Sequence, residues 1–460
     1  MRRKILFSVL ILGAMLLSAC AVPAAPAATE MAEEGDGAPT GKLVFWNHPT
    51  ALEAAEEQQF WEDLNAAFEA EYEGVEVELV WVPWDQMYVS KINAIQSGEV
   101  PDMSFMGVEQ QVEFAEMDAV IPVDDLVEEL GGPEAFSGGL KYHWFQPSWS
   151  DEGHYWGVPY QEGGYLLYVR KDLAEKAGYS DPCPADWDAL VELALAMHDP
   201  ENEVYGIGLD YSVGNGTTQL YTTFWAAGGG QTLDKDKKVA VNTPENAKTL
   251  QFYADLWLVH DLLPPGVTTV TTYGTSTATP IDDWYNAGQI AMTVRNMNLP
   301  IVWERTQNPI REVTQVCMMP AGPSGHTGTF SQPGTLYIFK EANNPELAKE
   351  YIRFFYREEW QIRWAQVDGI IPLLKGLDVP GITDGYWYPF ILEEQSWGAR
   401  PGFWESHPKN LVAHEAFWPA LMVQDVVLKG MSVEDALAKY QEVVEELYGE
   451  PCSPLVEGCE

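Results

Sequence analysis

The feature that most constrains the fold is an alternation of apolar and amphipathic segments that begins at Lys42. Leu43–Trp46 is a continuous apolar run, as expected for a strand that is buried on both faces. Residues 60–68 place apolar side chains on one helical stripe, and residues 75–81 then alternate as a strand. A second helix leads to a third strand over residues 102–107. This βαβαβ order predicts a parallel sheet covered by helices, and therefore an α/β fold.

Length and composition predict a globular protein with two domains. The chain has 460 residues, and a single hydrophobic core usually stops growing at about 250–300 residues. Hydrophobic residues make up 46% of the chain and charged residues 21%, which is typical of a folded protein. The formal net charge is −43, so nothing neutralises phosphates and a nucleic-acid partner is excluded. The same self-repelling surface favours a monomer.

The N-terminus has the pattern of a secretory signal. A basic start at residues 2–4 precedes the apolar run Ile5–Leu17, which is too short to span a bilayer comfortably. Residues 17–20 read Leu-Ser-Ala-Cys and resemble a bacterial lipobox, which predicts a signal peptide over 1–20 and lipidation of Cys20. The alternative is a plain signal peptide with an incidental cysteine. Residues 21–40 are rich in Ala, Pro, Glu and Gly, and we expect a disordered tether there.

Four further cysteines lie in the remainder of the chain. Cys452 and Cys459 are close together in a Pro/Gly-rich tail, and an oxidising exterior would favour a disulfide between them. Cys183 and Cys317 either pair or stay buried as small apolar side chains, and the sequence does not choose. No segment after the signal is long and apolar enough to cross a membrane, so we expect a tethered extracytoplasmic protein.

The stretch YWGVPYQEGGYLLYVRK at residues 155–171 contains two short strands separated by Glu162 and a pair of glycines. Adjacent glycines permit backbone angles that Cβ forbids, which suits a hinge and equally suits a surface turn. This stretch resembles the "YGVPY…lYYNKDL" segment of the family 1 extracellular solute-binding proteins, the sugar-capturing subunits of bacterial ABC importers. Residues 186–190, DWDAL, continue the resemblance.

Further segments extend this resemblance over residues 42 to about 449. Residues 285–296, YNAGQIAMTVRN, and the strand 313–320 resemble the segments in which the family's chain crosses between lobes. The resemblance implies a two-lobed periplasmic-binding-protein-like fold of type II, with mainly parallel sheets and three interlobe crossings. We accordingly expect lobe one at 41–160 plus 287–321, and lobe two at 161–286 plus 322–460.

Patterns that would indicate an enzyme are missing from the sequence. There is no HExxH, GxSxG, Walker or CxxC motif, and the eight histidines lack metal-ligand spacing. Residues 234–238 begin like a calcium loop but place Lys238 where an oxygen ligand is needed. We therefore expect no catalytic residue, no metal and no cofactor. An extracellular carbohydrate-active enzyme, which needs two carboxylates across a cleft, remains the alternative class.

A sugar site is better supported, because aromatic faces pack on sugar C–H faces while amides and carboxylates bind hydroxyls. The chain holds 18 Trp, 21 Tyr and 17 Phe, and α/β sheets bind ligands beyond the carboxyl ends of their strands. Positions at strand ends, at the hinge and on nearby helices are the candidates for ligand contact. They are Trp46, Asn47, Trp84, Glu109, Gln110, Glu162, Tyr165, Asp210, Asn215, Trp225, Arg295, Asn296, Gln332 and Trp404.

Several candidates also have a purely structural interpretation. Trp84 and Trp225 are helix residues that could belong to the core, and Asn215, Asn296 and Gln332 could stabilise their own turns. Arg295 could pair with an acidic neighbour. With these alternatives open, the prediction is a sugar-capturing binding protein that closes on its ligand and delivers it to a membrane permease. The same fold binding a polyamine, a peptide or a glycerol phosphate is the alternative.

Overall fold

The computed structural model describes most of the chain beyond the N-terminal segment. The described residues are 39–49, 54–137, 145–146, 154–161, 164–234, 236, 238–269, 280–329, 334–392, 409, 412–413 and 416–449. The predicted signal peptide and Cys20, almost all of the tether, and Cys452 and Cys459 lie outside this part of the chain. Residues 39–460 form one compact unit.

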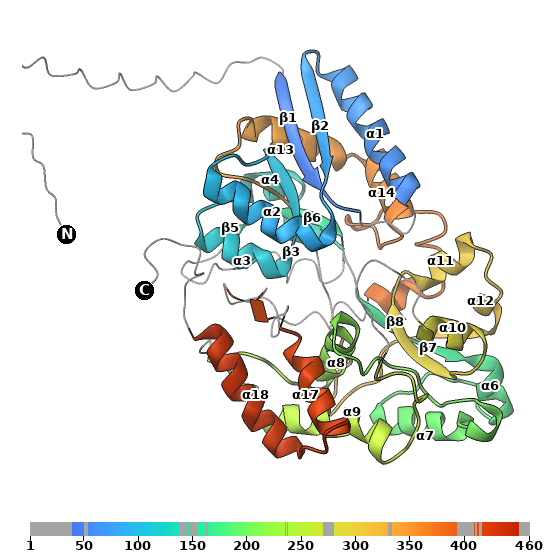
Figure 1. The fold of residues 1–460 in the computed structure, drawn as a ribbon. Helices are drawn as coiled ribbons and strands as arrows, with labels where there is room; N and C mark the ends of the chain where they lie inside the picture. Colours follow the sequence, from blue (N-terminus) through green and yellow to red (C-terminus); the bar gives the residue numbers. More distant parts are fainter. Residues whose placement is uncertain are drawn as a thin grey trace, which may run out of the picture. The chain divides into compact units, whose positions relative to one another are not determined.

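Two separate sheets organise that unit, and the larger one defines lobe one (Figure 1). Its five strands follow the order β2-β1-β3-β10-β6. Their bounds are β1 Gly41–Asn47, β2 Val75–Trp81, β3 Met103–Gly107, β6 Val158–Gln161 and β10 Gly334–Ile338. The first three strands are parallel, as predicted, while β10 runs antiparallel to both β3 and β6.

Helices with a buried apolar side cover the lobe-one sheet. They are α1 Ala54–Glu71, α2 Trp84–Ser97, α3 Val108–Glu116, α4 Asp124–Glu129, α13 Pro345–Phe355 and α14 Glu358–Asp368. The predicted stripe of α1 is fully buried at Phe60, Leu64 and Phe68, and it packs with aromatic residues of α13 and α14. Gly98 closes α2, as predicted, with a left-handed φ of 73° that glycine adopts readily. Short elements complete the lobe: η1 Pro133–Ala135, β4 Phe145–Gln146 and β5 His154–Tyr155.

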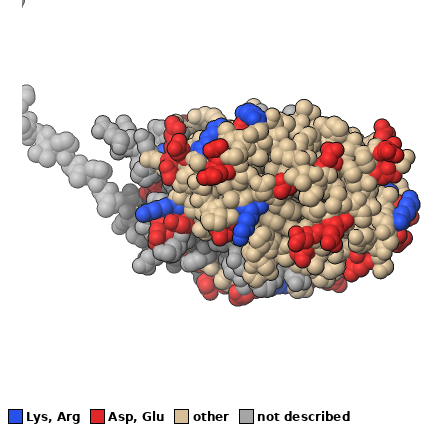
Figure 2. Space-filling model, turned by 90° about the horizontal axis from the view of Figure 1, so that it is seen from below, with Lys and Arg blue, Asp and Glu red and all other residues tan. Residues whose placement is uncertain are grey.

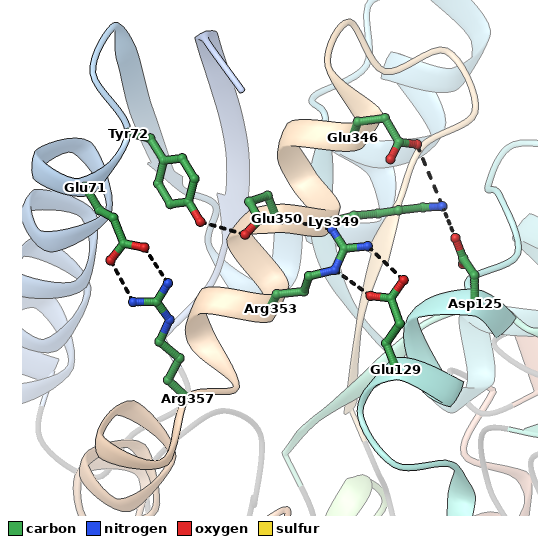
Figure 3. Close-up of polar contacts among 9 residues, drawn as sticks. All are labelled: Glu71, Tyr72, Asp125, Glu129, Glu346, Lys349, Glu350, Arg353 and Arg357. Carbon is green, nitrogen blue, oxygen red and sulfur yellow. Dashed lines mark hydrogen bonds and ion pairs between the residues drawn. The ribbon is translucent and has the colours of Figure 1, made fainter. Parts of the chain in front are cut away.

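Ion pairs connect α13 to both of its neighbours in lobe one (Figure 3). Arg353 makes a two-pronged contact with Glu129 of α4, at 2.6 and 3.3 Å. Lys349 lies 2.6 Å from Asp125 of the same helix. On the other side, the Tyr72 hydroxyl, just beyond α1, donates to Glu350. These contacts are exposed or half-buried, so they fix the position of α13 more than they add stability.

The second sheet has three strands in the order β8-β7-β9 and defines lobe two. Both β8 (Met292–Asn296) and β9 (Thr314–Cys317) run antiparallel to β7 (Tyr165–Arg170). Single parallel bridges join Tyr205 to Ile290 and Gly208 to Thr293, so residues 204–209 contact this sheet through isolated bridges. The mainly parallel arrangement expected for both lobes therefore holds for lobe one and not for the strands around β7.

Helices surround this second sheet and share one large hydrophobic core with it (Figure 1). They are α6 Lys171–Lys176, α7 Trp187–Met197, α8 Asn215–Gly228, α9 Pro244–Leu258, α10 Pro280–Asn286, α11 Leu299–Arg305, α12 Ile310–Val313, α17 Trp418–Val427 and α18 Val433–Tyr448, with the short helix η2 at Pro200–Asn202. Side-chain caps begin two of these helices: Thr243 accepts a hydrogen bond from the Asn246 amide, and Ser432 accepts one from the Asp435 amide.

Sheet membership corrects the predicted lobe boundaries. Residues 287–321 were expected in lobe one, but they supply β8 and β9 to the lobe-two sheet. Residues 334–373 were expected in lobe two, but they supply β10, α13 and α14 to lobe one. Leu373 is buried in the lobe-one core. The chain does pass between the sheets three times: between β6 and β7, between β9 and β10, and between Leu373 and Val379. The lobe boundaries depend on antiparallel pairing between strands that are distant in sequence, and local sequence patterns do not predict such pairing.

Cys183 and Cys317 form a disulfide, which settles the pairing that the sequence left open. Their Cα atoms are 5.4 Å apart, and the bridge closes a loop across a sequence separation of 134 residues. Both cysteines pack in the core of lobe two, so the crosslink joins β9 to the segment before α7. A covalent bond of this kind is typical of proteins that work in an oxidising compartment.

Acidic side chains are scattered over the surface, as the net charge predicted. On the face shown in Figure 2, Asp and Glu are distributed in several places and Lys and Arg are fewer. Among the helices that the structure describes, none has both the length and the apolar character needed to cross a membrane.

Candidate functional site

Polar side chains gather at the carboxyl end of β1 in lobe one, where the strand-end rule predicted them. Trp46 is half-buried beside β2 and β3, and its carbonyl accepts a hydrogen bond from Ser104 at 2.7 Å. Asn47 is buried, and its amide donates to the Tyr160 hydroxyl at 3.1 Å. Tyr160 comes from β6, which enters the sheet beyond β10. The first predicted residues are therefore held in place by the core beneath them.

A buried lysine lies next to this strand end. The Lys91 side chain, on α2, is 1% exposed and donates to the carbonyl oxygen of Phe105 and to Gln110 Oε1, the latter at 3.4 Å. Gln110, which lies on α3, is one of the predicted site residues, and its side-chain oxygen accepts this hydrogen bond from the Lys91 ammonium. The buried imidazole of His48 packs edge-on against Phe105. Burial, reinforced by the positive charge of Lys91, holds the pKa of His48 well below its usual range.

The lobe-two site is built around Arg295, the penultimate residue of β8. Its Nε donates to Asp282 Oδ1 of α10 at 2.8 Å, and its Nη1 donates to the Val294 carbonyl at 3.1 Å. Asp210, which follows the bridge at Gly208, places Oδ2 3.8 Å from Nη1. Two predicted residues, Asp210 and Arg295, are thus brought together, and Asp282 joins them.

Burial decides the electrostatics of this group. Asp210 is 2% exposed, and burial raises its pKa to about 6 although Arg295 acts in the opposite direction. The pKa of Arg295 is raised because the two carboxylates outweigh its own burial. With both carboxylates ionised, two negative charges share one guanidinium, so these three side chains carry a net charge of −1.

Tyr165, at the start of β7, borders the same group. Its hydroxyl donates to Gln219 of α8, and its backbone amide donates to Thr329 Oγ1 at 2.8 Å. Burial raises the pKa of the Tyr165 hydroxyl; the positive charge of Arg295 lowers it, and the negative charges of Asp210 and Asp282 raise it further. Tyr165 was predicted to bind ligand from the hinge. In the structure it directly follows the crossing from β6 to β7 and lies beside the group formed by Arg295, Asp210 and Asp282.

The first turn of α8 adds further buried polar atoms to lobe two. The hydroxyls of Ser212, Thr217 and Thr218 are buried, and they make no hydrogen bond with any residue that the structure describes. Gly214 precedes the helix and offers no capping side chain. These hydroxyls were missed by the sequence analysis, which singled out Asn215 in the same turn.

The remaining candidates divide into three groups. Trp84, Glu109 and Asn215 begin or lie in the first turn of α2, α3 and α8, but their side chains are outside the described set. Glu162, Gln332 and Trp404 lie outside the described residues altogether. Asn296 is exposed at the end of β8 and caps its own turn by accepting from the Asn298 amide, the structural alternative considered for it.

Trp225 is buried in the core of lobe two, which is the structural interpretation considered for it. It is buried, and its ring packs edge-on against Tyr221 of α8 and Trp418 of α17. A tryptophan on the inner stripe of a helix packs against neighbouring helices, so its aromatic face is already covered. The periodicity of α8 contained this signal, because Leu220, Tyr221 and Phe224 belong to the same buried side.

Five further residues of the candidate site were not singled out from the sequence: His48, Lys91, Tyr160, Gln219 and Asp282. His48 directly follows a candidate strand end, so extending the strand-end rule by one residue would have found it. The others lie on helices or in mid-strand, and only tertiary packing shows which way they point. Among the described residues no group of His, Cys, Asp and Glu is suited to hold a metal ion.

Two α/β lobes, three crossings and polar groups at strand ends define a two-lobed binding protein of the type II periplasmic class. Residues 53–362 match the family described as bacterial extracellular solute-binding protein. The chain belongs to this family, which is extracytoplasmic by its description. The three-crossing architecture that the resemblance implied is thereby confirmed.

Individual relatives agree with this assignment. A putative binding protein of Brucella abortus is 26% identical over 321 residues, which cover 69% of this chain and 73% of that protein. The arabinooligosaccharide-binding protein of Halalkalibacterium halodurans is 23% identical over 327 residues, 68% of this chain and 66% of that protein.

Solved structures share the fold. The MalE sugar-binding protein of Xanthomonas citri has a TM-score of 0.73 at 20% identity, over 89% of this chain and 98% of that one. Maltose-bound T. maritima MalE3 has a TM-score of 0.68 at 22% identity, over 88% and 99%.

Proposed function

We propose that the protein captures a sugar, either a mono- or an oligosaccharide, between its two lobes and releases it unchanged to an ABC transporter. The observation that carries this proposal is the pair of buried polar groups at strand ends, Asn47 with Gln110 in lobe one and Asp210 with Arg295 in lobe two. Amides, carboxylates and a guanidinium are the partners that sugar hydroxyls require, and Trp46 offers an aromatic face. Relatives named for arabinooligosaccharide and maltose support the same ligand class.

Capture would work by closure of the lobes on the ligand. A sugar that contacts both lobes favours the closed state by its differential affinity for that state. Shifting a mostly open population to a mostly closed one requires about 5.5 kcal/mol of such differential affinity. A few hydrogen bonds from each lobe and one stacked tryptophan are sufficient for this.

The partners of the loaded protein would be the permease subunits of an importer in the cytoplasmic membrane. We propose that the protein acts as a monomer and is tethered to the outer face of that membrane by a lipid on Cys20. A lipoprotein cysteine carries more than one acyl chain, which stable anchoring requires. Replacing Cys20 by Ser should move the protein from the membrane fraction to the soluble extracytoplasmic fraction, and retention in the membrane would contradict the anchor.

Calorimetric titration with a panel of neutral mono- and oligosaccharides tests the proposal, together with spermidine and glycerol 3-phosphate as competitors. We expect saturable binding of at least one sugar at a one-to-one ratio. Chromatography of the bound sugar after long incubation should recover it intact. Turnover would support the alternative of a carbohydrate-active enzyme, and capture of a competitor alone would refute the sugar assignment.

Trp46 provides a sharper test of the site. Trp46→Ala should weaken sugar binding by more than about tenfold with little change in melting temperature, because the ring is only half-buried. Trp360→Ala is the matched control, since Trp360 is partly buried on α14 and packs against Phe60. The control should lower the melting temperature and leave affinity unchanged. Unaltered affinity in Trp46→Ala would remove Trp46 from the site.

A further inference from the structure

Asp210 carries a buried oxygen with no protein donor. Its side chain is 2% exposed, and Oδ1 accepts no hydrogen bond from any residue that the structure describes. The other oxygen, Oδ2, lies 3.8 Å from Arg295 Nη1, which is ion-pair distance and too long for a hydrogen bond. A buried carboxylate normally accepts several hydrogen bonds, and leaving one oxygen without a donor costs free energy.

Arg295 directs at least two of its hydrogen bonds to acceptors other than Asp210. Its Nε donates to Asp282 at 2.8 Å, and its Nη1 donates to the Val294 carbonyl. The guanidinium therefore lies beside Asp210 and neutralises it only partly. Its stronger contact is the one with Asp282.

The groups around Asp210 come from four elements. They are Arg295 of β8, Asp282 of α10, Tyr165 of β7 and Tyr253 of α9. The Tyr253 hydroxyl donates to the backbone carbonyl of Asp210 at 2.9 Å and not to the carboxylate. One cation thus faces two carboxylates. Burial and Asp282 both raise the pKa of Asp210, which reaches about 6.

We propose that Oδ1 of Asp210 is the acceptor for a hydroxyl of a neutral sugar or polyol, and that this contact makes ligand affinity depend on pH. The proposal rests on the proposed function and specifies its ligand chemistry. An anionic ligand such as a sugar phosphate or sugar acid would meet two carboxylates and is disfavoured. An ammonium ligand would lie beside the Arg295 guanidinium, whereas a hydroxyl donates one hydrogen bond without adding charge.

The proposal makes affinity depend on pH in a defined direction. A hydrogen bond to the ionised form lowers the pKa of Asp210 in the complex, so binding near pH 6 releases a proton to the buffer. Above pH 7 the carboxyl is already ionised, and affinity should be constant. Below about 6 the proton competes with the ligand, and affinity should be about tenfold weaker at pH 5 than at pH 7.5.

Calorimetry on the full-length protein at pH 7.5, 6.0 and 5.0, in two buffers of different ionisation enthalpy, counts the released protons. With the sugar that binds most tightly from the panel, we expect close to one proton released at pH 5.0 and almost none at pH 7.5. Asp210→Asn should bind more than tenfold more weakly at pH 7.5, and its affinity should not vary with pH. Asp283→Asn is the matched control, because Asp283 is an exposed carboxylate next to Asp282 on the same helix; it should behave as the wild type.

The outcomes separate the two proposals. Sugar binding without proton release, with full affinity in Asp210→Asn, would overturn the role of Asp210 and leave the sugar function standing. If no sugar binds, the sugar function and this ligand chemistry both fall. The proton on Asp210 is then tested without ligand: wild-type melting temperature should fall relative to that of Asp210→Asn as pH rises from 4 to 7. Parallel melting curves would refute the protonation as well.

Discussion

The two lobes differ in how they hold the buried charges that lie near the strand ends of their sheets. In lobe one, Lys91 is buried against neutral acceptors, a backbone carbonyl and the Gln110 amide oxygen. In lobe two, two carboxylates share the single guanidinium of Arg295. The described contacts of the first group are those of a cation with neutral acceptors, whereas those of the second are between one cation and two carboxylates. Each is buried, so water screens neither of them strongly.

This difference teaches how a neutral ligand can be oriented without a charge of its own. A hydroxyl can donate or accept, so a polyhydroxylated molecule can turn acceptor oxygens toward lobe one and donor hydrogens toward lobe two. An anionic ligand, in contrast, would meet the two carboxylates of lobe two. The contrast thus favours neutral sugars over phosphates and polyamines, and it can be tested one residue at a time.

The largest effect is expected from removing the cation of lobe two. Arg295→Met leaves Asp210 and Asp282 buried together, and losing one partner of a buried ion pair typically costs about 3–5 kcal/mol. Urea unfolding at pH 7.5 measures the loss. Because the folded-state pKa of Asp210 is raised, its destabilising effect is present above about pH 6 and disappears below its unfolded value. Without Arg295 that pKa rises further, so the variant's deficit should shrink as pH falls from 7.5 to 4.

Arg311→Met is the matched control for Arg295→Met. Arg311 pairs with Glu304 on the surface of lobe two, with side-chain exposures of 31% and 63%. Its removal should cost less than about 1 kcal/mol, with little dependence on pH. Equal losses in the two variants, or a deficit of Arg295→Met that does not change with pH, would refute a net-anionic centre in lobe two.

The second largest effect is expected from the disulfide, which is the only crosslink within the described residues and lies in lobe two. Replacing Cys183 and Cys317 together by Ala should lower the free energy of unfolding by about 2–5 kcal/mol, given the 134-residue separation that the bridge spans. Hydrogen exchange should accelerate mainly in lobe-two elements such as β7 and β9. The wild type under reducing conditions provides the comparison. Equal acceleration in the lobe-one sheet would show that the lobes unfold as one unit.

Local patterns predicted the elements of the fold but not their partners. The strands at β1, β2 and β3 and the caps at Thr243 and Ser432 follow from periodicity and capping chemistry, which are local. The placement of β10 beside β3, and of β8 beside β7, joins strands more than a hundred residues apart. Such pairing depends on which strand edges and sheet faces the other elements leave uncovered. The lobe boundaries could therefore not be derived from single segments.

The candidate site divides in the same way. Strand-end position predicted Asn47, Gln110, Asp210 and Arg295, because carboxyl ends of strands meet at one edge. It could not predict Lys91, since a lysine on an amphipathic helix normally points to water and only packing against Phe105 buries it. For Trp225, the helical stripe indicates the buried position that the structure shows.

Lys91 itself gives the third prediction, on lobe one. Lys91→Met keeps the side-chain length but removes the donor to Phe105 and Gln110, which should cost about 1–3 kcal/mol of stability. The pKa of His48 should rise, because the positive charge lowers it, yet stay below its usual value, because burial is the larger cause. Imidazole proton shifts in an NMR titration measure this. Lys340→Met, which removes an exposed lysine paired with Asp118, is the control and should leave His48 unchanged. An unchanged pKa of His48 in Lys91→Met would contradict an electrostatic interaction between the two residues.

The smallest effect is expected at the surface of lobe one, where α13 is fixed by ion pairs (Figure 3). Arg353 contacts both Glu129 and Glu350, but these side chains are partly exposed to water. Arg353→Ala should therefore cost only about 0.2–1 kcal/mol. The deficit should shrink in 1 M salt, where charges are screened within about 3 Å. Arg295→Met should keep most of its deficit in the same salt, because its carboxylates are buried. A salt-insensitive loss at Arg353 would contradict this expectation and would mean that packing of the aliphatic stem, and not the charge, holds α13 against α4.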